Sequence, residues 1–193
     1  EMMGCELSDP FFTCDSFPGD FIEALAQATG TEFIGNKAAS GTDILRELGE
    51  EHMRTGHPIL YTSADSVLQI AAHEEVFGEK RLQETCRIAR ALLDERGMRV
   101  GRVISRPFTG KSASAFRRTG NRHDYSLTPC ETVLDRLGRC GVTVSGVGKI
   151  SDIFAGKGIA DSHPTKGNPD GMEVIGRLWA ETLDSCRFIF ANL

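Results

Sequence analysis

Hydrophobic residues recur every three or four positions in several stretches of the chain, which is the spacing of one face of a helix. The clearest of these stretches is 79–96, which Gly97 ends in the manner of a helix C-cap. Short apolar runs lie between the helical stretches and are typical of buried strands. The predicted helices are 18–29, 40–56, 79–96, 131–139 and 170–184. The predicted strands are 32–35, 58–62, 100–105, 142–147 and 187–193.

Helices alternate with short strands along the whole chain, so the pattern predicts an α/β or α+β fold. Two polar stretches without an apolar period, 107–122 and 151–169, are predicted to be loops. A change in composition near 122–128 marks a candidate domain boundary. The predicted apolar face of the last helix consists of Met172, Ile175, Leu178 and Trp179.

The segment 63–66 follows a predicted strand directly, and Ser66 and Gln69 have the spacing of a capping box. We therefore expect a helix to begin at Ser66, with free backbone N–H groups that would suit an anion. Asp65 has two interpretations at this point. Its carboxylate either caps the predicted helix or accepts a hydrogen bond from a sugar hydroxyl.

Charge is unevenly spread along the chain, whose net charge is −5. The window Arg99–His123 holds seven of the 22 Lys and Arg and none of the 27 Asp and Glu, so it carries +7 against −12 elsewhere. Such segregation indicates an anion-binding surface. A small phosphorylated ligand fits it better than nucleic acid, because the rest of the chain would repel a phosphate backbone. The plainer alternative is a solvated basic face.

Lys149 comes at the end of the predicted strand 142–147, where ligands bind in open α/β sheets. It is either a phosphate contact or a solvated loop residue. The five histidines show no HExxH or H-x-x-x-H spacing, so we expect no metal site within the chain. No apolar run has the length of a membrane span and no signal peptide is evident, so we expect a cytoplasmic protein without a membrane partner.

Five segments together resemble phosphopentomutase, a family of the alkaline phosphatase superfamily that serves nucleoside salvage. They are Ile34–Thr42 (IGNKAASGT), Tyr61–Glu75 (YTSADSVLQIAAHEE), Gly101–Phe108 (GRVISRPF), Asn121–Tyr125 (NRHDY) and Gly148–Phe154 (GKISDIF). The resemblance implies an alkaline-phosphatase-like α/β core into which an α+β cap is inserted. By this resemblance, 1–8 is a core segment, 9–125 is the cap and 126–193 returns into the core, which is only partly present.

The family interconverts ribose or deoxyribose 1-phosphate and 5-phosphate through a phosphorylated threonine and two manganese ions. The resemblance places that threonine upstream of Glu1 and the metal ligands outside the chain. We therefore expect both ends to have been cut from a longer protein, and this chain to be inactive alone. A pentose phosphate is then the expected small-molecule partner, with manganese (Mn2+) as the cofactor of the parent isomerase.

The residues carried over from the resemblance are substrate contacts. Asp65 and the backbone of Ile104 are expected near the sugar. Arg102, Arg118 and Lys149 are expected to bind phosphate. The loop length also allows Arg117 in place of Arg118.

Two other functions remain open on the sequence. A non-catalytic sugar-phosphate-binding module would use the same residues as the enzyme. A nucleic-acid-binding fragment would instead show DNA affinity that depends steeply on salt concentration.

Overall fold

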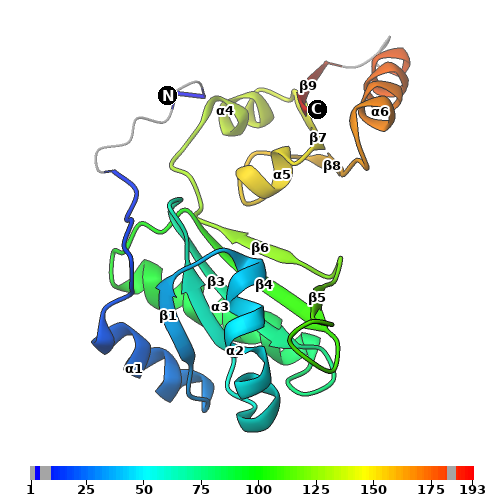
Figure 1. The fold of residues 1–193 in the computed structure, drawn as a ribbon. Helices are drawn as coiled ribbons and strands as arrows, with labels where there is room; N and C mark the ends of the chain where they lie inside the picture. Colours follow the sequence, from blue (N-terminus) through cyan, green and yellow to red (C-terminus); the bar gives the residue numbers. More distant parts are fainter. Residues whose placement is uncertain (1–2, 5–9, 182–185) are drawn as a thin grey trace. The chain divides into compact units, whose positions relative to one another are not determined.

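A computed structural model describes residues 3–4, 10–181 and 186–193, and it divides the chain into two compact units (Figure 1). The larger unit is 10–127, and the smaller is 128–193 together with Met3 and Gly4. Helices and strands are mixed in both units, which confirms the predicted α/β class. The identity of the two units as cap and core stays a prediction.

The larger unit contains three helices and six strands in its described residues. The helices are α1 (Gly19–Thr29), α2 (Gly41–Thr55) and α3 (Glu79–Glu95). The strands are β1 (Ile34–Ala38), β2 (Ile59–Thr62), β3 (Val67–His73), β4 (Arg102–Thr109), β5 (Arg117–Arg118) and β6 (His123–Ser126). They form one sheet in the order β1-β2-β3-β4-β5, and β6 pairs with the same edge of β4 as β5 does.

The direction of the strands explains where the helices lie. The pair β1–β2 is parallel and so is β3–β4, but β2 and β3 are antiparallel, so the two pairs run in opposite directions. Crossovers between parallel strands are almost always right-handed. The crossover helices α2 and α3 must therefore lie on opposite faces of the sheet, as Figure 1 shows.

Each face of this sheet has its own apolar cluster. Leu60, Leu68 and Val103 belong to the cluster under α1 and α3. Tyr61 and Phe108 belong to the cluster under α2. Adjacent residues of a strand thus serve opposite faces, as the two-residue period of a strand requires.

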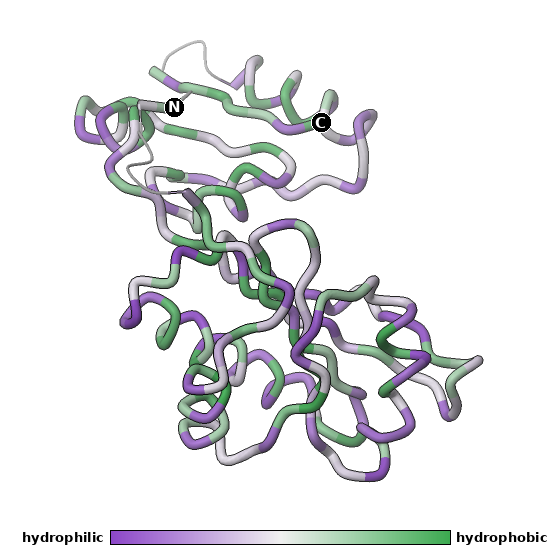
Figure 2. Tube along the Cα trace, turned by 60° about the vertical axis from the view of Figure 1, so that its left-hand side comes forward, coloured by the Kyte–Doolittle hydropathy of each residue, from purple (hydrophilic) through white to green (hydrophobic). Residues whose placement is uncertain are grey.

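The smaller unit is built on three parallel strands in the order β8-β7-β9. Its elements are α4 (Val133–Arg139), β7 (Thr143–Gly148), α5 (Ile150–Ile153), β8 (Asp161–His163), α6 (Asn168–Ala180) and β9 (Arg187–Asn192). The capping box of α4 comes from Thr132 and Asp135. Hydrophobic colour dominates the chain along β9 near the C-terminus (Figure 2).

The helices predicted from periodicity are confirmed within a few residues of their ends, except that 182–184 lies outside the described residues. The helix predicted at Ser66 is wrong, because 67–73 is strand β3 and is buried over its whole length. A continuous apolar run fits a strand buried on both faces as well as it fits a helix. The capping-box spacing that favoured a helix was therefore a coincidence.

Three smaller expectations are also corrected. The stretch predicted as a basic loop ends β4 and contains β5, and the loop predicted at 151–169 contains β8 and most of α5. In α6 only Leu178 of the predicted apolar face is buried, whereas Met172 and Trp179 are exposed.

Within the described ranges, none of the helices has the length and apolar character needed to cross a membrane.

Candidate functional site

Four arginines gather on the face of the larger sheet that α2 partly covers. Arg102 and Arg106 lie on β4 on either side of Ile104, and all three point to this face because side chains alternate along a strand. Arg118 comes from β5, and Arg122 comes directly before β6. Both of these lie close enough to Arg106 for their charges to lower its pKa.

Asp124 brings a carboxylate to the same face. It pairs with Ile104 across β4 and β6, and its side chain is only 12% exposed. Arg122 binds it through Nε at 2.6 Å and Nη2 at 2.5 Å, and Nη1 of Arg102 lies 3.6 Å away. The positive charge of four guanidinium groups exceeds the charge of this carboxylate, so the cluster attracts anions.

Arg106 is half-buried and its side chain is held by a buried neighbour. Its Nε donates a hydrogen bond to Oε1 of buried Gln69 at 3.0 Å. Its guanidinium group also lies close enough to the hydroxyl of Tyr61 for its charge to oppose the rise that burial causes in the pKa of that hydroxyl. Burial lowers the pKa of Arg106, and the nearby charges of Arg122 and Arg118 lower it further.

Gly41, the first residue of α2, makes room for two of these groups. A Cβ there would lie 2.8 Å from Nη2 of Arg118 and 2.8 Å from Oη of Tyr61. The guanidinium and the hydroxyl are therefore close neighbours at the start of α2. Burial raises the pKa of Tyr61, and the charges of Arg106 and Arg118 oppose that rise.

Of the predicted substrate contacts, Arg102, Ile104 and Arg118 lie on this one face. Asp65 is exposed in the loop between β2 and β3. The pairing of Val67 with Arg102 places that loop at the end of the sheet where β4 begins. The roles of these residues stay predictions.

Ser66 does not provide the helical anion site that the sequence suggested. Its hydroxyl donates to the carbonyl oxygen of Phe12 at 2.5 Å and accepts from the N–H of Gly101 at 3.0 Å. Ser66 thus fastens the segment before α1 and the start of β4 to the β2–β3 loop.

Lys149 belongs to the smaller unit, whereas the other predicted contacts belong to the larger one. Gly148 ends β7 with φ +75°, and a Cβ there would lie 2.1 Å from the carbonyl oxygen of Asn192, so only glycine fits. Lys149 follows as the exposed N-cap residue of α5. It therefore sits at the carboxyl end of a parallel strand, where ligands bind in open sheets.

Arg117 and Arg118 differ in what their side chains contact. Both line a pocket of about 390 Å³ beside α2, together with Arg46. Nη1 of Arg117 donates to the carbonyl oxygens of Ser114 and Phe116, so this side chain is committed to its own loop. The guanidinium of Arg118 lies instead against Gly41 and Tyr61. This geometry favours Arg118 over Arg117 as the residue of this loop that would contact phosphate.

The sequence alone did not identify Arg106, Tyr61 or Gln69 as site residues. The alternation of Arg102, Ile104 and Arg106 was a readable signal, because it places all three on one face of a strand. No comparable signal marks Tyr61 and Gln69. They reach the cluster only through the pairing of β2, β3 and β4.

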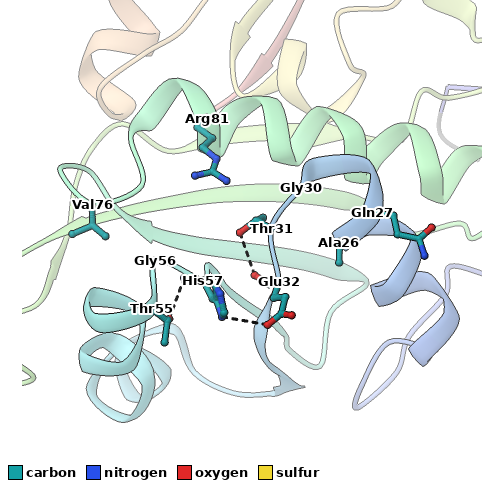
Figure 3. Close-up of a pocket in the computed structure, with 10 residues that line it drawn as sticks. All are labelled: Ala26, Gln27, Gly30, Thr31, Glu32, Thr55, Gly56, His57, Val76 and Arg81. Atoms are coloured by element: carbon teal, nitrogen blue, oxygen red, sulfur yellow. Dashed lines mark hydrogen bonds and ion pairs between the residues drawn. The ribbon is translucent and has the colours of Figure 1, made fainter.

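A second cavity, of about 600 Å³, lies where the ends of α1 and α2 meet the start of α3 (Figure 3). Its charged groups already have partners. Glu32 lies 3.8 Å from Nδ1 of His57, and the guanidinium of Arg81 sits 4.4 Å above the ring of Phe77. The predicted substrate contacts lie elsewhere, so we assign no ligand to this cavity.

In the part of the chain that the structure describes, no group of three or more His, Cys, Asp or Glu is arranged to hold a metal ion. These residues therefore do not fit the two manganese ions that the resemblance implies.

No family model matches the chain. Curated proteins similar to it include the phosphopentomutase of Symbiobacterium thermophilum, 55% identical over an alignment that takes in 100% of this chain and 49% of that protein. The phosphopentomutase of Carboxydothermus hydrogenoformans is 56% identical over the same shares of the two chains. That of Pseudothermotoga lettingae is 49% identical over 100% of this chain and 50% of its own length.

The chain thus spans about half the length of the curated relatives it matches, and it matches them from end to end. In sequence, the chain corresponds to about half of a phosphopentomutase.

Proposed function

We propose that this chain binds a pentose phosphate as part of a phosphopentomutase, an isomerase that interconverts the 1-phosphate and 5-phosphate of ribose or deoxyribose. The observation that carries the proposal is the gathering of Arg102, Arg106, Arg118 and Arg122 on one sheet face. Guanidinium groups bind phosphate through paired, charge-assisted hydrogen bonds. The name of the relatives supplies the substrate class.

Within this proposal, Arg102 and Arg118 of the larger unit bind the phosphate group, and Lys149 of the smaller unit remains a predicted phosphate contact. The exposed carboxylate of Asp65 accepts hydrogen bonds from sugar hydroxyls, and the backbone of Ile104 lies near the sugar. A site of this kind needs positive charge for the phosphate and acceptors for the hydroxyls, and these residues provide both.

The phosphothreonine and two manganese ions of the family complete the proposal for the whole enzyme. Because the described residues do not fit a metal site, we derive no step through manganese from them. We expect the nucleophile and the metal ligands to lie outside this chain, and we expect no mutase turnover from the chain alone. Turnover by a pure sample of the 193-residue chain would contradict that expectation.

Calorimetric titration with ribose 5-phosphate, with ribose as the uncharged comparison, tests the binding function. Arg102→Ala and Arg118→Ala should each weaken ribose 5-phosphate binding about tenfold or more, because each removes charge-assisted hydrogen bonds. Arg87→Ala is the matched control, because Arg87 is an exposed arginine of α3. Arg117→Ala should also leave the affinity nearly unchanged.

Equal affinity of the wild type and both arginine variants would overturn the assignment. A longer protein that contains this sequence distinguishes the enzyme from a non-catalytic sugar-phosphate-binding module. With manganese present, the enzyme converts ribose 5-phosphate to the 1-phosphate, whereas the module binds it without turnover.

A further inference from the structure

The hydroxyl of Tyr61 occupies an unusual position between two guanidinium groups. The ring lies in the apolar cluster under α2, and the residue is only 1% exposed. The hydroxyl lies close enough to Arg106 and Arg118 for their charges to oppose the rise that burial causes in its pKa, and it shares the space above Gly41 with Nη2 of Arg118.

The chemistry of these neighbours decides what the hydroxyl of Tyr61 can do. A guanidinium group has donors and no acceptor, so Arg106 can only donate to the oxygen of Tyr61, and the hydroxyl proton is left to donate elsewhere. Arg118 offers that proton no acceptor either. The hydroxyl of Tyr61 can therefore donate to an acceptor that enters from outside the protein. An anionic oxygen would accept from the hydroxyl and from both arginines.

Arg106 is held in place for such a contact. The bond from its Nε to Gln69 fixes the plane of the guanidinium, and Gln69 is itself only 6% exposed. The charges of Arg118 and Arg122 lie close enough to the guanidinium group of Arg106 to lower its pKa. Arg118 is exposed, so its long side chain is able to turn from the hydroxyl toward an entering anion.

We propose that the Tyr61 hydroxyl and the Arg106 guanidinium contact the phosphate group of the ligand directly, in addition to Arg102 and Arg118, and that Gln69 positions Arg106. The inference rests on the proposed function, because it takes a phosphate monoester as the ligand. A phosphate group has several oxygens that accept from a hydroxyl and two guanidinium groups at once. These donors select a phosphorylated pentose over the free sugar.

Tyr61→Phe is the sharpest test, because it removes one hydroxyl and keeps the buried ring. We expect the affinity for ribose 5-phosphate, measured by calorimetry, to fall about ten- to a hundredfold. The chain has one other tyrosine, Tyr125, whose hydroxyl is buried without a hydrogen-bond partner among the described residues. Tyr125 packs against the cluster under α1 and α3, so Tyr125→Phe is the control and should bind as the wild type does.

The roles of Arg106 and Gln69 are separated by a double-mutant cycle. Arg106→Lys keeps the charge and loses the forked donors, so it should weaken binding about tenfold. Gln69→Leu should weaken binding in the wild-type background and have little effect in the Arg106→Lys background, because a positioning residue acts only through its partner. A merely structural role for Gln69 would instead lower the affinity equally in both backgrounds.

Thermal unfolding of every variant shows that the fold is retained, and inorganic phosphate serves as a second probe. Wild-type affinity in Tyr61→Phe and Arg106→Lys, with binding by the wild type established, overturns this inference and leaves the proposed function intact. Binding of inorganic phosphate without ribose 5-phosphate would overturn the proposed function, and the same variants would then decide the inference with phosphate. Binding of neither probe by the wild type overturns both.

Discussion

The two faces of the sheet in residues 10–127 are built from the same strands and differ in what covers them. On one face, α1 and α3 cover side chains such as Phe21, Leu68 and Leu93, each with no exposed surface. On the other face, α2 covers a smaller cluster that includes Tyr61 and Phe108. Beyond that cluster the same face carries arginines, Gln69 and Asp124.

This difference separates stability from binding within one sheet. Apolar burial is the main favourable contribution to folding, and it is concentrated under α1 and α3. The arginine cluster holds like charges together, and the lowered pKa of Arg106 shows that burial and its neighbours disfavour the cation. An anion would stabilise that cation. The first face therefore contributes most to the stability of the fold, and the second is the face to which we assign the proposed ligand.

The largest expected effect belongs to the apolar face. Phe21→Ala should lower the free energy of unfolding by about 3–5 kcal/mol, because it removes a fully buried aromatic ring and leaves a cavity. Urea unfolding measures the loss. Phe11→Ala, at a residue 44% exposed, should cost far less. A large fall in ribose 5-phosphate affinity in folded Phe21→Ala would show that the two faces are not separate.

A smaller effect is expected on the pH dependence of stability, through the hydrogen bond that joins α2 to strand β3. His52 of α2 is fully buried, with Nδ1 2.8 Å from the carbonyl oxygen of His57 and Nε2 2.9 Å from the backbone N of His73. The N–H of His73 is a donor, so Nε2 accepts and Nδ1 carries the proton. Burial lowers the pKa of His52. Protonation would put a second donor against the N–H of His73.

The sign of the pH dependence follows from that lowered pKa. Below the unfolded value of about 6.5, the unfolded chain binds a proton that the folded chain excludes, so stability falls as the pH falls. The contribution is fully present above about pH 6.5. Melting temperatures at pH 5.5 and 7.5 should differ more for the wild type than for His52→Gln. His57→Gln, at a histidine whose side chain is 33% exposed, is the control, and equal pH dependence in all three proteins would contradict this role.

The two faces also differ in how far the sequence predicted them. Helical periodicity predicted α1 and α3 correctly, because each has one apolar stripe that faces the core. Strand β3 was mistaken for a helix, because it is buried on both faces and lacks the alternation that reveals a half-exposed strand. The apolar face was therefore predictable from its helices better than from its strands.

The arginine cluster was only half predictable, for a physical reason. A basic window is visible in the sequence, but the gathering of Arg102, Arg118 and Tyr61 depends on which strands pair and in which register. Register is decided by contacts between distant segments, and no local pattern contains it. The resemblance supplied Arg102 and Arg118 without explaining what surrounds them.

The smallest effect is expected from Gly41→Ala, which adds one methyl group at the start of α2, next to Arg118 and Tyr61. The Cβ of Gly41→Ala would lie 2.8 Å from the flexible guanidinium of Arg118 and 2.8 Å from the hydroxyl of Tyr61, whose ring is held by its burial. Arg118 therefore has to move, and the ring of Tyr61 or the start of α2 has to shift as well. We expect ribose 5-phosphate binding to lose about 1 kcal/mol, roughly fivefold in Kd, as measured by calorimetry.

Gly19→Ala is the matched control for Gly41→Ala, because Gly19 is also the first residue of a helix and a Cβ there meets nothing within 4 Å. Both variants gain the higher helix propensity of alanine, so any change in stability that they share reflects propensity alone. Weaker ribose 5-phosphate binding in Gly41→Ala alone would show that the start of α2 belongs to the ligand site. Equal affinities in both variants would place the ligand away from Gly41, and would limit the role of α2 to covering Tyr61 and Phe108.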